Sequence, residues 1–199
     1  MLLYDSRVSG NCYKVRLLLA HLGRRYERRE MDVVDRSNRA AVLGDLNPGL
    51  RVPTLVLDDG RSLGESNAIT FYLAEGTPYL PEDAFARAQV LQWLFFEQYS
   101  HEPYIAVLRF WLHVAHMTPS PDAVEAKRRG GEAALAALER HLEANRSFLV
   151  AERYTIADIA LYAYTHVADE AGFDLGRYPA IRTWLGRVRE QPEHVTIDA

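Results

Sequence analysis

The sequence contains a single cysteine, Cys12, so the chain cannot form an internal disulfide. It also lacks an excess of charge, because 23 Lys and Arg stand against 27 Asp and Glu and leave a formal net charge of -4. This balance gives no broad attraction to nucleic acid or to an anionic membrane, and we expect neither as a partner. No apolar run is long enough to span a bilayer, and the opening MLLYDS lacks a signal-peptide pattern. Together these absences predict a soluble, cytoplasmic protein.

Metal-binding patterns are scarce as well. His101, His113 and His116 lie in one region, but no cysteine or carboxylate spacing accompanies them, and we expect no bound metal.

What the chain does have is a large apolar fraction: 48% of its 199 residues are hydrophobic. That fraction is enough to build a packed core, in one large domain or two small ones.

The first 76 residues alternate strand and helix patterns. An apolar run, LLY, precedes a helix pattern in which apolar residues recur at i, i+3, i+4 and i+7 from Val15 to Leu22. A charged edge-strand pattern over 26–33 and a short helix over 38–46 follow. VPTLVLDDGRSL is then a hairpin around an Asp-Gly turn, and a helix capped by Ser66 completes the domain. The predicted order is βαβαββα, an α/β domain over residues 1–76.

The rest of the chain has only helix patterns. Residues 77–82 form a proline-containing linker, and an all-helical domain is expected over 83–199. Its first helical stretch should be kinked or broken at Pro103. Thr155 and Asp158 in TIADIAL have the spacing of a capping box, which we interpret as structural rather than catalytic.

The segment VSGNC falls between the first strand and the first helix, a place where open α/β sheets bind ligands. A redox protein would have Cys-x-x-Cys here, whereas this chain has Ser9 three residues before Cys12. Two interpretations follow from these residues. The segment is a redox motif with one half missing, or it is a site for the thiol of another molecule.

Four segments, SGNCYKVR, NPGLRVPTL, LGES and TIADIAL, together resemble the cytosolic glutathione transferase family over essentially the whole chain. The first segment is similar to the bacterial, theta, zeta and nu types, which use serine or threonine. The resemblance implies a thioredoxin-like N-terminal domain that binds glutathione as co-substrate and an all-α domain that holds a hydrophobic electrophile. It also implies a homodimer, in which each N-terminal domain faces the partner's helical domain, and a role in detoxification.

On this resemblance Ser9 is catalytic. Its hydroxyl and the amides at the start of the helix would stabilise the glutathione thiolate, since a free thiol has a pKa of about 8.5 and only the thiolate is nucleophilic. Asn11 has the spacing of the asparagine that lies at the thiol in nu-type members. As alternatives, Ser9 is an ordinary loop residue and Asn11 is a helix N-cap.

Cys12 has two interpretations. If it faces the thiol site, it could form a mixed disulfide, as the cysteine of the omega and beta classes does. If it lies in the first turn of the helix and points inward, it is a buried and inert residue, which is the interpretation that we favour.

The resemblance also assigns the glutathione contacts. Val52-Pro53 is expected to be a cis peptide, so that the Val52 backbone pairs with the cysteinyl unit. Ser66 would bind the γ-glutamyl carboxylate and Glu65 the ammonium group. Arg51 is expected either to reach the glycine carboxylate or to be a solvated surface residue.

Tyr104 and Phe110 are the residues predicted to line the electrophile pocket, although aromatic residues at helical spacing also fit a core. The leading functional hypothesis is a glutathione S-transferase that directs the thiolate at a hydrophobic electrophile. A glutathione-dependent disulfide reductase or peroxidase is the first alternative, favoured by Asn11 and Cys12. A non-catalytic binding protein with the same fold is the second.

Overall fold

The computed structural model describes residues 1–144 and 146–199, which divide into two compact units. The first unit comprises Met1–Glu75 together with Pro192–Ala199, and the second comprises Gly76–Gln191. The prediction placed residues 192–199 in the helical domain, whereas in the structure they belong to the first unit. Hydrogen bonds to the first helix hold them there.

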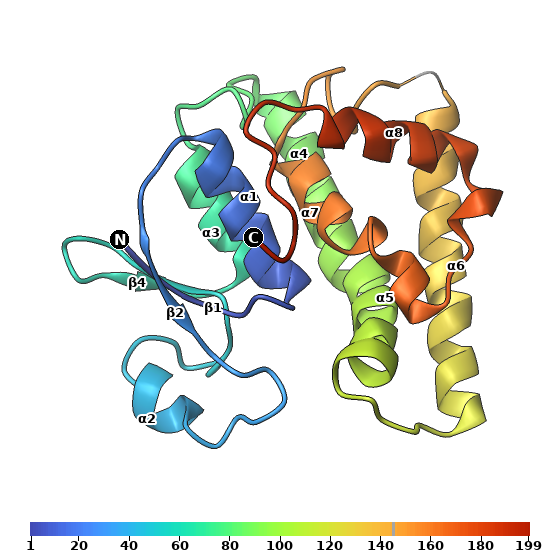
Figure 1. The fold of residues 1–199 in the computed structure, drawn as a ribbon. Coiled ribbons are helices and arrows are strands. Elements are labelled where there is room, and N and C mark those ends of the chain that lie inside the picture. The colour runs from blue at the N-terminus through green and yellow to red at the C-terminus, as the bar shows by residue number, and fades with distance from the viewer. Residues whose placement is uncertain (145) are drawn as a thin grey trace. The chain divides into compact units, whose positions relative to one another are not determined.

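The first unit is a four-stranded mixed sheet flanked by helices (Figure 1). Its elements are β1 (Leu2–Asp5), α1 (Gly10–His21), β2 (Glu27–Glu30), α2 (Arg39–Leu43), β3 (Thr54–Val56), β4 (Ser62–Leu63) and α3 (Ser66–Ala74). The strand order is β2-β1-β3-β4, with β1 parallel to β2 and antiparallel to β3. The predicted βαβαββα order and the thioredoxin-like class are confirmed, and the charged strand β2 lies at a sheet edge as expected.

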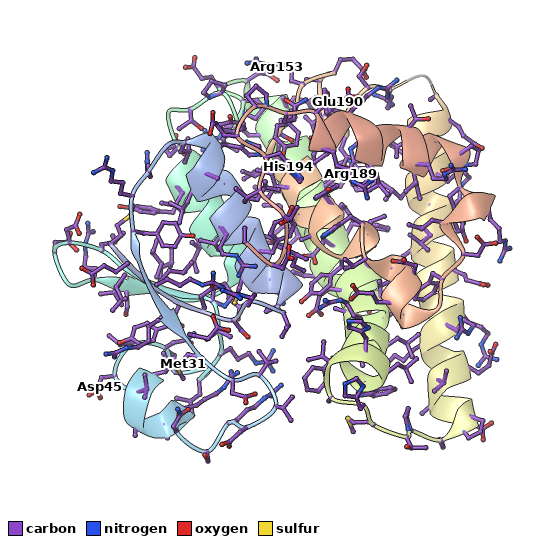
Figure 2. All side chains as sticks on the ribbon, viewed as in Figure 1. Met31, Asp45, Arg153, Arg189, Glu190 and His194 are labelled. Carbon is purple, nitrogen blue, oxygen red and sulfur yellow. The ribbon has the colours of Figure 1, made fainter. Side chains whose placement is uncertain are left out.

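Helices α1 and α3 cover one face of the sheet, and α2 lies on the other (Figure 1). The side chains from Leu17 to Leu19 of α1 are fully buried, which is why this apolar stretch forms a helix on the sheet. On the opposite face a smaller apolar cluster joins Tyr4 of β1, Leu43 of α2 and Met31, which is labelled in Figure 2. Helix α2 is shorter than the predicted 38–46 and ends at Leu43.

The segment Pro192–Ala199 packs along α1 through its backbone carbonyl groups. The Pro192 carbonyl accepts a hydrogen bond from His21 Nδ1 at 2.7 Å, and the Val195 carbonyl accepts one from the Tyr13 hydroxyl at 2.7 Å. The ring of His194, labelled in Figure 2, also approaches Tyr13, with 3.3 Å between Nε2 and the hydroxyl oxygen. These bonds join the C-terminal segment to the first unit.

The second unit is helical. Its elements are α4 (Ala84–Phe96), the π-helical turn η1 (Glu97–His101), α5 (Glu102–Arg109), the π-helical turn η2 (Phe110–Val114), α6 (Pro121–Glu143), α7 (Ile156–Thr165), the 3₁₀ turns η3 (Ala168–Ala171) and η4 (Leu175–Arg177), and α8 (Pro179–Arg189). No helix in the described part of the chain is long and apolar enough to cross a membrane.

Two local predictions for this unit can be compared with the structure. The interruption expected at Pro103 takes the form of η1, which ends directly before α5 and places Pro103 in the first turn of α5. Proline lacks an amide donor and its ring clashes with a helical carbonyl, so a wider turn before it relieves the conflict. The capping box of Thr155 and Asp158 is confirmed, and every residue of α7 is buried.

Candidate functional site

The candidate site lies in the first unit, at the end of the sheet where strand β1 finishes. Strand β1 ends there and continues into the loop that carries Ser9. Strand β3 is antiparallel to β1 and starts at Thr54 beside the end of β1, so Val52-Pro53 approaches the same end of the sheet. Strand β4 is antiparallel to β3 and therefore delivers Glu65 there too. Ser9, Val52-Pro53 and Glu65 are far apart in the sequence and thus meet at this end of the sheet.

Ser9 is the N-cap of α1. Its Oγ accepts a hydrogen bond from the Cys12 amide at 3.3 Å, and its backbone is extended, with φ −85° and ψ 120°. Accepting this bond uses a lone pair and not the hydroxyl proton, so the cap and a bond donated to a thiolate are compatible. The N-cap is therefore Ser9 and not Asn11, which belongs to the helix itself.

Asn11 and Ser66, predicted from separate motifs, are in contact. The Ser66 hydroxyl donates to Asn11 Oδ1 at 3.1 Å, and Ser66 is only 4% exposed. An amide that accepts with its oxygen on one side presents its NH₂ group as a donor on the other side. The contact with Ser66 thereby orients Asn11, the residue predicted to lie at the thiol.

The start of α3 differs from the prediction in one respect. Ser66 is the first residue of the helix rather than its cap, and the cap position belongs to Glu65, whose side chain makes no capping bond. Glu65 has φ 60° and ψ 113°, a conformation that costs a non-glycine residue about 1–3 kcal/mol. Backbone strain of this kind is typical of ligand-binding sites. The Glu65 side chain is exposed at this end of the sheet.

The expected cis peptide at Val52-Pro53 is confirmed. Just before it, the Arg51 carbonyl accepts bonds from Asn47 Nδ2 at 3.0 Å and from the Thr54 hydroxyl at 2.8 Å. Arg51 itself is exposed, so its side chain is accessible to an anionic ligand and to solvent alike.

Cys12 is fully buried and makes no disulfide. Burial, reinforced by the negative charge of Asp5, raises the pKa of the Cys12 thiol far above its usual value. The thiol is therefore protonated at neutral pH and is out of reach of a ligand. This matches the interpretation of Cys12 as an inert residue of the first helical turn.

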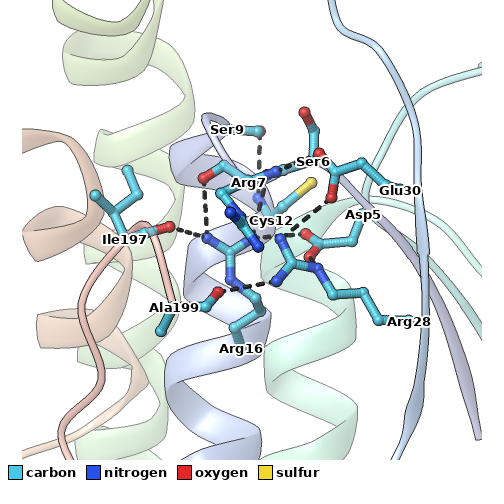
Figure 3. A network of polar contacts seen from close by, with 10 residues as sticks. All are labelled: Asp5, Ser6, Arg7, Ser9, Cys12, Arg16, Arg28, Glu30, Ile197 and Ala199. Carbon is cyan, nitrogen blue, oxygen red and sulfur yellow. Dashed lines mark hydrogen bonds and ion pairs between the residues drawn. The ribbon is translucent and has the colours of Figure 1, made fainter.

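A buried charge network supports the loop before Ser9 (Figure 3). Asp5, at the end of β1, is fully buried and pairs with two arginines, Arg16 of α1 at 2.7 Å and Arg28 of β2. Arg16 also donates to the Ser6 carbonyl at 3.1 Å. One guanidinium thus joins the strand, the helix and the loop.

The second guanidinium nitrogen of Arg16 extends this network. It donates to the Arg7 carbonyl at 3.1 Å and to the Ile197 carbonyl of the C-terminal segment (Figure 3). The Arg28 guanidinium likewise donates to Ala199. The loop that presents Ser9 and the C-terminal segment therefore share one anchor, Arg16.

The two predicted pocket residues lie in the second unit. The Tyr104 ring packs on Gly130 of α6, where an added Cβ would lie 2.2 Å from Tyr104 Cδ1. The Lys127 ammonium lies 5.4 Å from the centroid of the same ring. Phe110 opens the π-helical turn η2 and is partly buried. Tyr104 therefore contributes to the packing between α5 and α6.

Lys14, which is not one of the predicted site residues, is fully buried beside Ser66. The sequence signal for Lys14 was a charged residue on an apolar helix face, because Leu17 and Leu18 follow it at i+3 and i+4 and are buried.

Within residues 1–144 and 146–199, no group of three or more His, Cys, Asp or Glu is arranged to hold a metal ion.

Comparison with known proteins agrees with this architecture. Residues 3–79 match the family model described as "Glutathione S-transferase, N-terminal domain", and residues 121–187 match "Glutathione S-transferase, C-terminal domain". A solved glutathione S-transferase from Pseudomonas fluorescens [Pf-5] is 48% identical, with a TM-score of 0.92 over 98% of each chain.

Two further relatives differ in what their names say. The disulfide-bond oxidoreductase YfcG of Escherichia coli (strain K12) is 34% identical over 154 residues, which are 74% of this chain and 71% of the relative. The structure of Ure2p in complex with glutathione is 25% identical, with a TM-score of 0.87 over 96% of this chain and 90% of the other. With both of its domains matched and these relatives alongside, the chain belongs to the glutathione S-transferase family.

Proposed function

We propose that this protein is a glutathione S-transferase that uses glutathione as co-substrate and activates its thiol with Ser9. The observation that carries the proposal is the position of Ser9, whose hydroxyl caps α1 as an acceptor, so that the cap does not use the hydroxyl proton. A thiolate placed there would receive this bond and would lie at the positive end of the helix dipole. Lowering the thiol pKa by two requires only about 2.7 kcal/mol of such preferential stabilisation.

The remaining site residues would hold the tripeptide in register. Asn11, whose amide oxygen contacts the Ser66 hydroxyl, would donate to the same sulfur with its NH₂ group. The Val52-Pro53 backbone would pair with the cysteinyl unit as an added strand does. The start of α3 and Glu65 would take the γ-glutamyl end, with the carboxylate on Ser66 and its backbone amide.

In the reaction, the thiolate sulfur would form a bond to the electrophilic carbon of an apolar substrate, and the leaving group would depart with the electron pair. Catalysis would then consist of thiolate stabilisation and proximity. Tyr104 and Phe110 remain our proposed contacts for that substrate. Detoxification of electrophiles in the cytoplasm is the corresponding physiological role.

Disulfide exchange is the second candidate. It is favoured by the Ser9-x-Asn11 spacing and by the similarity to a disulfide-bond oxidoreductase. Since Cys12 is buried, the chemistry would use glutathione alone: its thiolate attacks a substrate disulfide and releases one thiolate, and a second glutathione resolves the mixed disulfide. Peroxide reduction would use the same two equivalents of glutathione.

A homodimer is part of the proposal. Phe95 of α4 and Tyr99 of η1 are four positions apart and are 68% and 84% exposed. Phe85, at the start of α4, is 72% exposed. Phe85, Phe95 and Tyr99 form the exposed aromatic face of α4 and η1. Large aromatic side chains left open to solvent are typical of an interface.

The deciding experiment is a pH titration of bound glutathione, followed by the ultraviolet absorbance of its thiolate, on the wild type, Ser9→Ala and Ser9→Thr. We expect a thiol pKa near or below neutrality in the wild type and in Ser9→Thr, and a value returning toward about 8.5 in Ser9→Ala. Equal values near 8.5 in all three proteins would reject thiolate activation by Ser9.

Turnover assays on the same preparations then separate the candidates. Conjugation of an aryl halide that exceeds disulfide reduction supports the transferase, and the reverse ratio supports the reductase. Glutathione binding without either activity would support a non-catalytic binding protein instead.

A further inference from the structure

Lys14 of α1 is fully buried, and its ammonium group points to the first turn of α3. It donates to Ser66 Oγ at 3.3 Å and to Asn67 Oδ1 at 3.3 Å. We propose that Lys14 is a positioning residue that makes the site selective for peptides with a free carboxylate at the γ-glutamyl end. This inference rests on the proposed function, because it concerns the same glutathione site.

Packing alone does not call for a charge at this position. Burying an ammonium group is expensive, whereas methionine would fill a similar volume at little cost. The neighbours of Lys14 on the same face of α1, Leu17 and Leu18, are apolar and buried. An ammonium kept in such surroundings indicates a requirement for its charge.

The charge lies directly behind the residue that would bind the carboxylate. Ser66 is the first residue of α3, a nine-residue helix, so its amide is at the positive end of the helix dipole. A carboxylate bound to Ser66 would be separated from the Lys14 ammonium by one hydroxyl group. In a buried site this attraction is much stronger than in water.

The hydroxyl of Ser66 also transmits the effect of Lys14. It accepts from Lys14 and donates to Asn11 Oδ1 at 3.1 Å, and a hydroxyl that accepts from a cation is a stronger donor. A bound carboxylate would compete with Asn11 Oδ1 for this single donated hydrogen bond, while the bond from Lys14 to Ser66 remains. Lys14 therefore acts through Ser66 and need not touch the ligand.

The test compares two ligands by titration calorimetry: glutathione, and the same tripeptide with its γ-glutamyl carboxylate converted to an amide. We expect the wild type to prefer glutathione. Lys14→Met should lose about tenfold or more in affinity for glutathione, the range for a hydrogen-bonded charge, and should bind the amide within about twofold of the wild type. Lys14→Gln is a second neutral variant, and Lys14→Arg should restore part of the preference.

Asn67→Ala is the matched control, because it removes the other acceptor of Lys14 and leaves the bond to Ser66 in place. It should retain the preference for glutathione. Equal losses for both ligands in Lys14→Met and Lys14→Gln would indicate a merely structural role and overturn the inference, as would an unchanged preference. A wild type that binds neither ligand would instead overturn the proposed function, and this inference with it.

Discussion

Asp5 and Arg16 form an ion pair at 2.7 Å in which neither side chain reaches solvent, with exposures of 0% and 2%. Removing Arg16 leaves the buried Asp5 with Arg28 alone, and the bonds from Arg16 to the Ser6 and Arg7 carbonyls are lost as well. Breaking a buried ion pair typically costs about 3–5 kcal/mol. We therefore expect Arg16→Met to lower the free energy of unfolding by about 3 kcal/mol or more, measured by urea denaturation.

Arg61 offers the control for this pair. It lies 2.7 Å from Asp59, but the two side chains are 74% and 52% exposed. Water and salt screen exposed ion pairs so that they contribute little to stability, and Arg61→Met should be nearly neutral. If the two variants lost the same amount, burial of the Asp5 pair would not be the source of its effect.

Cys12 should be unreactive in the folded protein. Burial raises the pKa of its thiol, and the thiolate is the species that iodoacetamide alkylates. We expect alkylation, followed by mass spectrometry, to be at least about a hundredfold slower in buffer than in urea at pH 8. Raising the pH to 9 should accelerate the reaction in urea and leave the folded protein nearly unaffected.

Cys12→Ser should accordingly keep most of the disulfide-reductase or transferase activity that the wild type has. Rapid labelling of Cys12 in buffer, or loss of activity in a folded Cys12→Ser variant, would make Cys12 a candidate catalytic residue.

Asp158 should make stability depend on pH. Its buried carboxylate accepts bonds from Thr155, from the Leu149 amide and from the Trp184 indole. Burial nevertheless raises the pKa of Asp158 from 3.8 to about 6. Because the folded state then holds this proton more tightly than the unfolded chain, the stabilisation is complete below about pH 4 and is lost as pH rises through about 6.

Asp158→Asn cannot ionise and isolates this contribution. From pH 4 to pH 7, we expect the stability of the wild type relative to Asp158→Asn to fall by about 2 kcal/mol. Urea denaturation monitored by tryptophan fluorescence measures it, because Trp184 contacts the carboxylate. Asp122→Asn changes an exposed carboxylate and serves as the control. A relative stability that rises with pH would contradict the prediction.

Two helical glycines should respond oppositely to alanine. A Cβ at Gly130 would lie 2.2 Å from the Tyr104 ring, so Gly130→Ala should destabilise the protein by about 1–3 kcal/mol. At Gly186 of α8 nothing lies within 4 Å of the added atom, and alanine should stabilise the helix by up to about 1 kcal/mol. Thermal melts of both variants check this, and a gain in stability at Gly130 would show that the Tyr104 ring can move aside.

The exposed aromatic face should mediate dimerisation. Phe95→Glu with Tyr99→Glu places two charges on this face, and we expect the protein to sediment as a monomer at micromolar concentration. A wild type that sediments as a monomer would remove the dimer from the proposal.

Local sequence signals predicted much of the fold. The order of strands and helices, the edge position of β2 and the capping box of Thr155 and Asp158 follow from periodicity and from caps encoded within a few residues. The cis peptide at Val52-Pro53 came from the family resemblance. The expected cap at Ser66 was wrong, because the strained backbone of Glu65 starts the helix one position earlier.

The sequence alone therefore determined the two domain types and the motifs of the site, since these depend on spacing between near neighbours. Only the tertiary structure decided how those motifs meet: Ser66 and Asn11 are 55 positions apart, and Arg16 joins the Ser9 loop to the C-terminal segment. Such contacts depend on strand pairing, which brings loops that are distant in the sequence to the same end of the sheet. Lys14 is the clearest case, because a lysine in a helix pattern indicates an ammonium group in water, and only the packing of α1 on α3 buries its charge against Ser66.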